Sequence, residues 1–195
     1  MALPFTDTQK STIRDRLLKS AMKYAIKTGV KKTSLDMLAA DAGIAKSSFY
    51  KFFDSKELLF LEAAGRWEEE IMSRARRALS ENGDLGDKAR AAAMVFSVFK
   101  AIHELGIARF LREDMPLLDA FVSDRAVKAH MLTSAQLLFD TLKEAKVRFT
   151  APDDTVCSVI QLMYLSILNI GDLGERYFPA LQELVAGACD RLVAE

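Results

Sequence analysis

Apolar residues recur every three or four positions along most of this chain, which is the spacing of one face of an α-helix. Half of the 195 residues are hydrophobic, and Gly and Pro are few, at nine and four. The chain is therefore predicted to be all-α, with enough apolar surface for a substantial core. The pattern predicts long helices over residues 9–27, 55–79, 87–104, 124–146, 153–170 and 179–193, and shorter ones over 107–113 and 117–121.

Two short helices joined by a sharp turn are predicted between residues 33 and 59. The first has apolar residues at the i, i+3, i+4 and i+7 positions counted from Leu35. The hydroxyl of Thr33 or Ser34 can cap its N-terminus by accepting an otherwise unpaired backbone N–H. Gly43 follows the last apolar position, and glycine enters a left-handed turn without steric cost. The first helix is therefore expected to end there.

The second helix of the pair is predicted to begin near Ala45 and to carry two different faces. Phe49, Phe52 and Phe53 would face inward. The outward face is short, polar and basic, and consists of Lys46, Ser47, Ser48, Tyr50 and Lys51. An α-helix fits the major groove of DNA and can present hydrogen-bond donors to base edges there. The predicted motif is a helix-turn-helix, closed into a three-helix core by the helix over 9–27.

A dense set of positions across this stretch matches one known pattern: Gly29, Thr33-Ser34, Ala39, Ala42–Lys46, Ser48–Tyr50, Phe52-Phe53 and Ser55–Leu59. On these residues, roughly residues 13–61 resemble the DNA-binding domain of the TetR (tetracycline repressor) family of transcriptional regulators. The sequence departs from the pattern at Val30, where the family often has an aromatic, and at Asp54, where proline is frequent. The resemblance implies a helix-turn-helix DNA-binding domain over 1–54 and a helical ligand-sensing and dimerisation domain over 55–195.

The candidate DNA-contacting residues are polar or basic: Thr33, Ser34, Lys46, Ser47, Ser48, Tyr50, Lys51 and Lys56. Lysines neutralise phosphate and release counterions, whereas hydroxyls donate to phosphate oxygens and fix the register. By resemblance, Thr33, Tyr50 and Lys56 occupy phosphate-contact positions. By the same resemblance, Lys46–Ser48 falls where the family reads bases. Lysine can bond O6 and N7 of guanine, so a G is predicted in each half-site.

The net charge of zero conceals an uneven distribution of charged residues. Residues 1–60 contain eleven Lys and Arg against six Asp and Glu, and the remainder has 16 against 21. A basic end on an acidic body suits a protein that presents that end to phosphate. Charge alone leaves open a chance distribution, and the motif favours the nucleic-acid interpretation.

The helix predicted over 153–170 is apolar almost all round. Its apolar run is about 15 residues, with Ser158 and Gln161 inside it, and a membrane span needs about 20. No membrane span is therefore expected. A helix apolar on every side is buried on every side, either at the centre of a monomeric core or in a subunit interface. With the resemblance, we expect a homodimer through 153–170 and 179–193, which would form a four-helix bundle from two chains.

A small-molecule site is expected in the helical body by resemblance, among aromatic side chains with few polar anchors. Taken singly, each of these aromatics is more often core than ligand wall. The resemblance places such a cavity between the fourth and eighth helices. The candidate pocket residues are Trp67, Phe96, Phe99, His103, Phe110, Phe121, Met131 and Tyr164.

No catalytic or metal-binding set is visible along the chain. His103 and His130 lack a metal-ligand spacing, so each is expected as an ordinary polar residue of a helix, with a pocket hydrogen bond as the alternative. Cys157 and Cys189 have no redox spacing, so buried thiols are expected. We predict no enzyme activity, metal or cofactor. The N-terminus lacks a basic-then-apolar export signal, which predicts a cytoplasmic protein.

Together these features predict a homodimeric repressor that binds a palindromic operator and leaves it when an apolar ligand binds the body. The ligand would tilt the helix over 55–79 and move the two recognition helices out of register. Two alternatives remain open. One is a DNA-binding dimer without a small-molecule effector, whose solid body serves dimerisation or a protein partner. The other is a helical enzyme with a vestigial head, which would need an acid/base set around His103 or His130.

Overall fold

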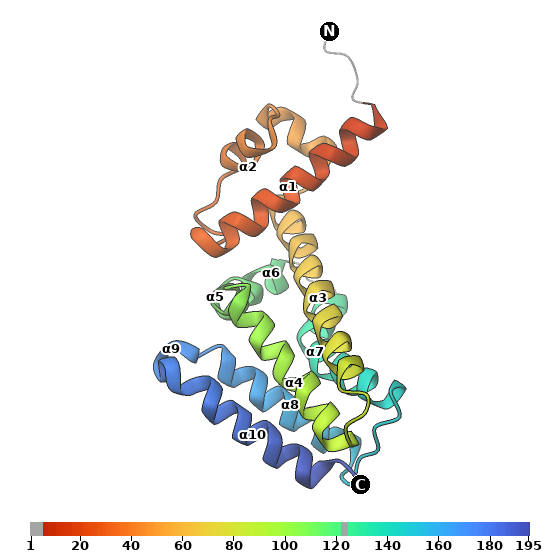
Figure 1. Ribbon diagram of the computed structural model, residues 1–195. Coiled ribbons are helices and arrows are strands. Elements are labelled where there is room, and N and C mark those ends of the chain that lie inside the picture. The colour runs from red at the N-terminus through yellow and green to blue at the C-terminus, as the bar shows by residue number, and fades with distance from the viewer. Residues whose placement is uncertain (1–5, 122–124) are drawn as a thin grey trace. The chain divides into compact units, whose positions relative to one another are not determined.

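The computed structural model describes residues 6–121 and 125–195, without the side chains of 125–134 and 172. These residues are helical nearly throughout (Figure 1). An isolated bridge pairs Phe149 with Val193. The predicted all-α fold is confirmed. Residues 6–68 and 109–121 form a first compact unit, and residues 69–108 and 125–195 form a second.

Helix α1 (Asp7–Lys27) of the first unit begins with a capping box. The Thr6 hydroxyl accepts the N–H of Gln9 at 3.3 Å, and the Gln9 side chain accepts the N–H of Thr6 at 2.9 Å. This reciprocal pair satisfies two N–H groups that the helix itself cannot. The helix therefore begins two residues before the predicted start at Gln9.

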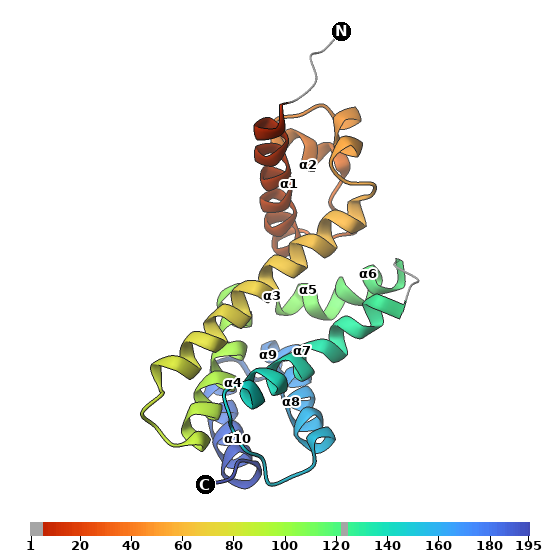
Figure 2. The ribbon, with the colours of Figure 1, turned by 90° about the vertical axis from the view of Figure 1, so that its right-hand side faces the viewer.

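The core of the first unit joins α1 to α2 (Leu35–Ala42), to the short 3₁₀-helix η1 (Lys46–Lys51) and to the start of α3 (Lys56–Glu81). In Figures 1 and 2, α1 lies alongside α2. Every side chain at the centre of this core is apolar and fully buried: Leu17, Leu18, Leu38, Phe49, Leu59 and Phe60. Helix α1 thus supplies the apolar surface that the helix-turn-helix of α2 and η1 lacks on its own.

Two short helices from later in the sequence complete the first unit. They are α5 (Ala108–Glu113), from Arg109 onward, and α6 (Met115–Phe121). Within this unit the rings of Trp67 and Phe110 pack edge to face, with centroids 5.1 Å apart. The boundary predicted after residue 54 lies just before α3, which begins at Lys56, whereas the compact units divide α3 after residue 68.

The second unit contains α4 (Asp87–Glu104), α7 (Arg125–Glu144), α8 (Asp153–Ile167) and α10 (Tyr177–Leu192). Its core is apolar, with Tyr177 inside it at hydrogen-bonding distance from Ser166, 2.9 Å between the two hydroxyl oxygens. Figure 2 shows α7 beside α8, and α8 and α10 also pack together. Between α8 and α10 the chain forms α9 (Ile170–Leu173) and η2 (Gly174–Arg176), where the sequence predicted a simple turn.

Helix α8 is buried on one side only within the single chain. Its buried residues are Val156, Ile160 and Ile167, whereas Leu162 is 66% exposed. The expectation of a helix buried on every side is therefore not met inside one chain. No helix in the described part of the chain combines the length and the apolar character needed to cross a membrane.

Candidate nucleic-acid interface

Helix α2 has the two ends that its sequence predicts. The Ser34 hydroxyl accepts the N–H of Met37 at 3.2 Å, which makes Ser34 the N-cap. Gly43 ends the helix with φ 73°, in the left-handed region that favours glycine. Both local predictions are confirmed. They place Ser34 on the surface at the start of α2 and turn the chain toward η1.

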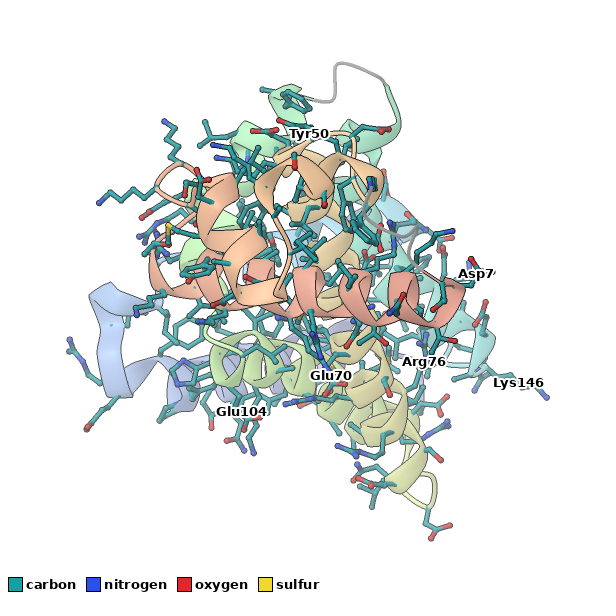
Figure 3. All side chains as sticks on the ribbon, turned by 90° about the horizontal axis from the view of Figure 1, so that it is seen from above. Asp7, Tyr50, Glu70, Arg76, Glu104 and Lys146 are labelled. Carbon is teal, nitrogen blue, oxygen red and sulfur yellow. The ribbon has the colours of Figure 1, made fainter. Side chains whose placement is uncertain are left out.

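The segment after the turn presents basic and polar side chains while one aromatic anchors it. Phe49 is fully buried, and Tyr50, labelled in Figure 3, is 58% exposed. Lys46, Ser47 and Lys51 are exposed, and Ser48 is half-buried. The segment is a 3₁₀-helix of six residues, narrower than the predicted α-helix. Its outward face nevertheless contains the residues predicted for it.

Lys46 has an acidic partner on the neighbouring helix. Its Nζ donates to a carboxylate oxygen of Asp36 at 2.7 Å, and this hydrogen bond raises the pKa of Lys46 above its ordinary value. Both side chains are largely exposed, and exposed pairs contribute little to stability. The lysine therefore stays charged, and little free energy opposes its exchange of Asp36 for another anion.

Thr33 is not on the surface that its predicted phosphate contact requires. The residue is 1% exposed, and its hydroxyl donates to the carbonyl oxygen of Gly29 at 2.7 Å. The hydroxyl also lies 3.1 Å from that of Thr28. Its side chain therefore braces the turn before α2 from inside, because a buried hydroxyl is stabilised by internal partners. Of the two adjacent hydroxyl residues, only Ser34 faces solvent.

Lys56 connects the start of α3 to the same turn. Its Nζ donates to the carbonyl oxygens of Val30 and Thr33, at 2.9 and 3.1 Å. A lysine ammonium has three donors, so one remains after these two bonds. The observed contacts give Lys56 a structural task that the sequence did not predict, and its phosphate contact stays a prediction.

Three exposed basic residues of the first unit were not among the candidate DNA contacts predicted from the sequence. Arg16, Lys31 and Lys32 have no ion-pair partner among the described residues. Arg16 lines an open groove of about 280 Å³ beside Gly43 and Ile44, at the turn that leads to η1. Two features of the sequence could have pointed to them: Arg16 lies outside the buried positions of α1, and Lys31 and Lys32 come just before the Thr33-Ser34 pair.

The predicted pocket residues are distributed over both units. Trp67 and Phe110 pack together in the first unit, where Phe121 is exposed. Phe96, Phe99, His103 and Tyr164 belong to the second unit, and the side chain of Met131 lies outside the described residues.

Two of the predicted pocket residues, Phe96 and His103, contact the ring of Phe178, which was not among the candidates. The ring of Phe178 packs edge to face against Phe96 and His103, with centroids 6.0 and 5.0 Å away.

The second unit has an apolar cavity of about 30 Å³ between α4, α7, α8 and α10. None of the eight predicted pocket residues lines it. The lining is entirely apolar apart from one thiol: Ala91, Val95, Leu142, Phe149, Val156, Val159, Ile160, Met163, Val185, Ala188, Cys189, Leu192 and Val193. Burial raises the pKa of Cys189 to about 11. Within the described part of the chain, no three His, Cys, Asp or Glu side chains gather as metal ligands would.

Comparisons with known proteins agree with this geometry. The family of bacterial regulatory proteins named tetR matches residues 17–63. An uncharacterised HTH-type transcriptional regulator of Bacillus subtilis (strain 168), YhgD, is 23% identical over 185 residues, covering 92% of this chain and 93% of that protein.

Solved structures show the same fold over almost the whole chain. A tetR-family regulator from Streptomyces coelicolor has a TM-score of 0.66 at 19% identity, covering 97% of this chain and 82% of its own. The ketosteroid transcriptional regulator KstR2 of Mycobacterium tuberculosis has a TM-score of 0.58 at 19% identity, covering 93% and 95%. The helix-turn-helix lies inside the residues that match the tetR family, so the predicted resemblance to TetR-family transcriptional regulators is confirmed.

Proposed function

We propose that this protein is a homodimeric repressor that binds a palindromic operator through η1 and leaves it when an apolar molecule binds the body. The carrying observation is the division of η1 into a buried Phe49 and an exposed face with Lys46, Ser47 and Tyr50. An anchored helix with outward donors can enter the major groove without loss of the core behind it.

The exposed donors divide into two roles. Lys46–Ser48 lies at the start of η1, the end of a recognition helix that usually meets base edges. Ser34, Tyr50, Lys51 and the remaining donor of Lys56 are proposed as phosphate contacts, which fix register without reading sequence. Thr33 is left out of this set because its side chain is buried.

Exposed leucines on adjacent helices support a dimer. Leu162 on α8 is 66% exposed, Leu184 on α10 is 61% exposed, and Leu165 is also exposed. The two helices pack against each other, so these side chains belong to neighbouring elements (Figure 1). Exposed leucines grouped on paired helices are typical of a subunit interface. A two-fold dimer requires two half-sites about 34 Å apart, hence a palindrome.

The effector is proposed to be an apolar small molecule. The cavity of the second unit has an apolar lining, and apolar lining is what a hydrocarbon or sterol-like ligand requires. One protein with the same fold is named a ketosteroid transcriptional regulator, which is consistent with this class of ligand. Binding would enlarge the cavity and displace the helices around it.

A second candidate function follows from the size of the same cavity. About 30 Å³ accommodates a water molecule and is far below the roughly 300 Å³ of a ligand pocket. This observation favours a DNA-binding dimer without a small-molecule effector, whose body serves dimerisation or a protein partner.

Operator binding is tested by selection of duplexes from a randomised pool with the full chain, followed by affinity measurements between about 50 and 200 mM salt. We expect enrichment of an inverted repeat and an affinity that falls steeply with salt. No enrichment, together with no binding to any duplex at the lower salt, would reject the proposed function. Enrichment of a sequence without internal symmetry would reject the dimeric mode.

The two candidates are separated by thermal unfolding of the chain with a panel of steroids, long-chain acids and planar aromatics. An effector should raise the unfolding temperature and weaken operator binding, since binding to the native state adds stability. Ala188→Leu should abolish the effect by filling the cavity, while Ala89→Leu, at an exposed position of α4, should preserve it. Operator binding that no panel compound alters supports the effector-free candidate.

A further inference from the structure

Two side chains of the α5–α6 segment bond to the end of α1 and to the turn before α2. One oxygen of Asp114 accepts the backbone N–H of Val30 at 3.1 Å, from 84 residues away. Nη2 of Arg109 donates to the carbonyl oxygens of Ala25 and Ile26, at 2.8 and 3.0 Å. These carbonyls belong to the last turn of α1, where helical partners run out. All of these residues lie within the first unit.

The burial of Asp114 requires an explanation. The residue is 5% exposed, and its second carboxylate oxygen has no hydrogen-bond donor among the described residues. A buried polar group is costly unless it is paired, so this position is expensive to maintain. The carboxylate does not cap α6. The N–H groups of Leu117 and Leu118 bond to the backbone carbonyl of Asp114, and the one hydrogen bond of the carboxylate among the described residues comes from Val30. The side chain therefore serves the contact with Val30.

Gly29 lets the two segments approach closely. Its φ is 82°, and a Cβ there would lie 3.1 Å from Nη1 of Arg109 and 3.2 Å from the unpaired oxygen of Asp114. Any side chain at this position would strain the backbone and push against both residues. Arg109, Asp114 and Gly29 thus form one fitted contact, which we name the turn clamp.

The turn held by the turn clamp leads directly into the DNA-facing helices. Both backbone polar groups of Val30 are hydrogen-bonded: Asp114 accepts its N–H, and Lys56 donates to its carbonyl oxygen. Lys56 also holds the carbonyl of Thr33, one residue before the Ser34 cap. The placement of α2, and of η1 after it, therefore depends on a turn fixed from α6 and from α3 together.

We propose that Arg109 and Asp114 are positioning residues for DNA binding, which hold the turn over residues 28–34 in the conformation that presents α2 and η1. This inference rests on the proposed function. Neither residue needs to touch DNA, since both act on the backbone that precedes the recognition elements.

The turn clamp also gives the second unit a covalent route to the DNA-binding surface. Residues 109–121 pack in the first unit, yet the chain enters them from α4 and continues from them to α7, both in the second unit. A rearrangement that displaces the ends of α4 or α7 would pull on α5–α6. Through Arg109 and Asp114, that displacement reaches Val30 and the α2 cap, a second route beside α3.

Arg109→Ala is the first test, because this side chain is partly exposed and its loss leaves the core intact. We expect operator affinity to fall at least fivefold, the lower end of the roughly 5- to 150-fold range of coupled effects. Arg112→Ala is the matched control, since it removes an arginine of the same helix whose guanidinium pairs with Glu113. The control should bind as the wild type does.

Asp114 provides a pair of variants that separates positioning from charge. Asp114→Ala removes the acceptor for Val30 and should weaken binding as Arg109→Ala does. Asp114→Asn keeps a carbonyl oxygen that can accept the same N–H, and should restore most of the affinity. If Asp114→Ala does not fold cooperatively, Arg109→Ala decides the question alone.

Two further measurements distinguish a positioning role of Arg109 and Asp114 from a direct contact with DNA. Amide exchange over residues 28–34 should accelerate in Arg109→Ala and Asp114→Ala and stay slow in both control variants. The salt dependence of operator binding should be unchanged, because no phosphate contact is removed. A slope reduced by about one in Arg109→Ala would make Arg109 a phosphate contact and overturn the proposal.

Wild-type affinity in both Arg109→Ala and Asp114→Ala would also overturn the proposal. If the wild type binds no duplex at all, the proposed function fails instead. The amide exchange over residues 28–34 still reports on the turn clamp in that case, so the two failures remain distinct.

Discussion

Lys46 and Asp36 show how the partner of a side chain changes what it can do. The lysine lies on the exposed face of η1, and the carboxylate 2.7 Å away lies on α2. In the free protein the aspartate holds the ammonium; near DNA the same carboxylate would repel phosphate. In the proposed DNA complex, Asp36 would lower the affinity while it orients Lys46, so removal of either member of the pair should have opposite effects.

Lys46→Ala should weaken operator binding and relax the preference at one base pair of each half-site, by about 1–3 kcal/mol of discrimination. Asp36→Ala should tighten binding, because a negative charge leaves the interface and the lysine is released. Selection of duplexes with each variant measures the base preference, and titration measures the affinity. An unchanged preference in Lys46→Ala would remove the residue from base reading.

Both cysteines should be slow to react in the native protein at pH 8. Burial raises the pKa of Cys189 to about 11, and burial followed by the charge of Asp140 raises that of Cys157. A raised thiol pKa means less thiolate at a given pH, and the thiolate is the reactive form. Alkylation followed by mass spectrometry should show slow labelling that accelerates on denaturation. Fast native labelling of Cys189 would contradict its burial.

At the scale of helices, features set by neighbouring residues were predicted and features set across long separations were not. The Ser34 cap and the Gly43 stop depend on residues within one turn, and both were found. The burial of Thr33 depends on Gly29 and Thr28, in a turn whose fold no periodicity encodes. The contact of Asp114 with Val30 crosses 84 residues, beyond the reach of any spacing rule.

The eight predicted pocket residues do not line the cavity of the second unit, for the same reason. Aromatic content identifies side chains that prefer burial, and burial alone does not say which of them share a cavity. The cavity of the second unit is instead lined by aliphatic residues such as Val159 and Val185, which look like ordinary core in the sequence.

Two glycines in helical surroundings should respond oppositely to alanine. Gly43 has φ 73°, so Gly43→Ala should destabilise the protein by about 1 kcal/mol or more, since a Cβ strains the left-handed region. Gly65 lies inside α3 with nothing within 4 Å of a Cβ, so Gly65→Ala should stabilise by about 0.5–1 kcal/mol. Urea unfolding of both variants measures the difference. Equal shifts of the same sign would contradict the assigned backbone conformations.

For the whole molecule, the single chain leaves apolar surface that its own fold does not cover. Leu162, Leu165 and Leu184 are exposed on two packed helices of the second unit. Residues 1–60 instead have a positive balance of charge, with eleven Lys and Arg against six Asp and Glu. One part of the chain thus suits phosphate, and another suits a second copy of itself. The proposed recognition of a palindromic operator would require both, because two DNA-binding domains held together by one interface read the two half-sites.

Leu162→Glu and Leu184→Glu should convert the dimer to a monomer, because each places a charge in an apolar interface where no partner compensates it. Leu85→Glu is the control, since Leu85 is also an exposed leucine, at 50%, but lies in the loop between α3 and α4. Sedimentation velocity measures the oligomeric state of each variant. A monomer keeps a folded head, so its affinity for one half-site should persist while binding to the full palindrome falls to that of a half-site. A dimer that survives both substitutions moves the interface away from α8 and α10. A monomer that still binds the full palindrome with wild-type affinity separates operator recognition from dimerisation.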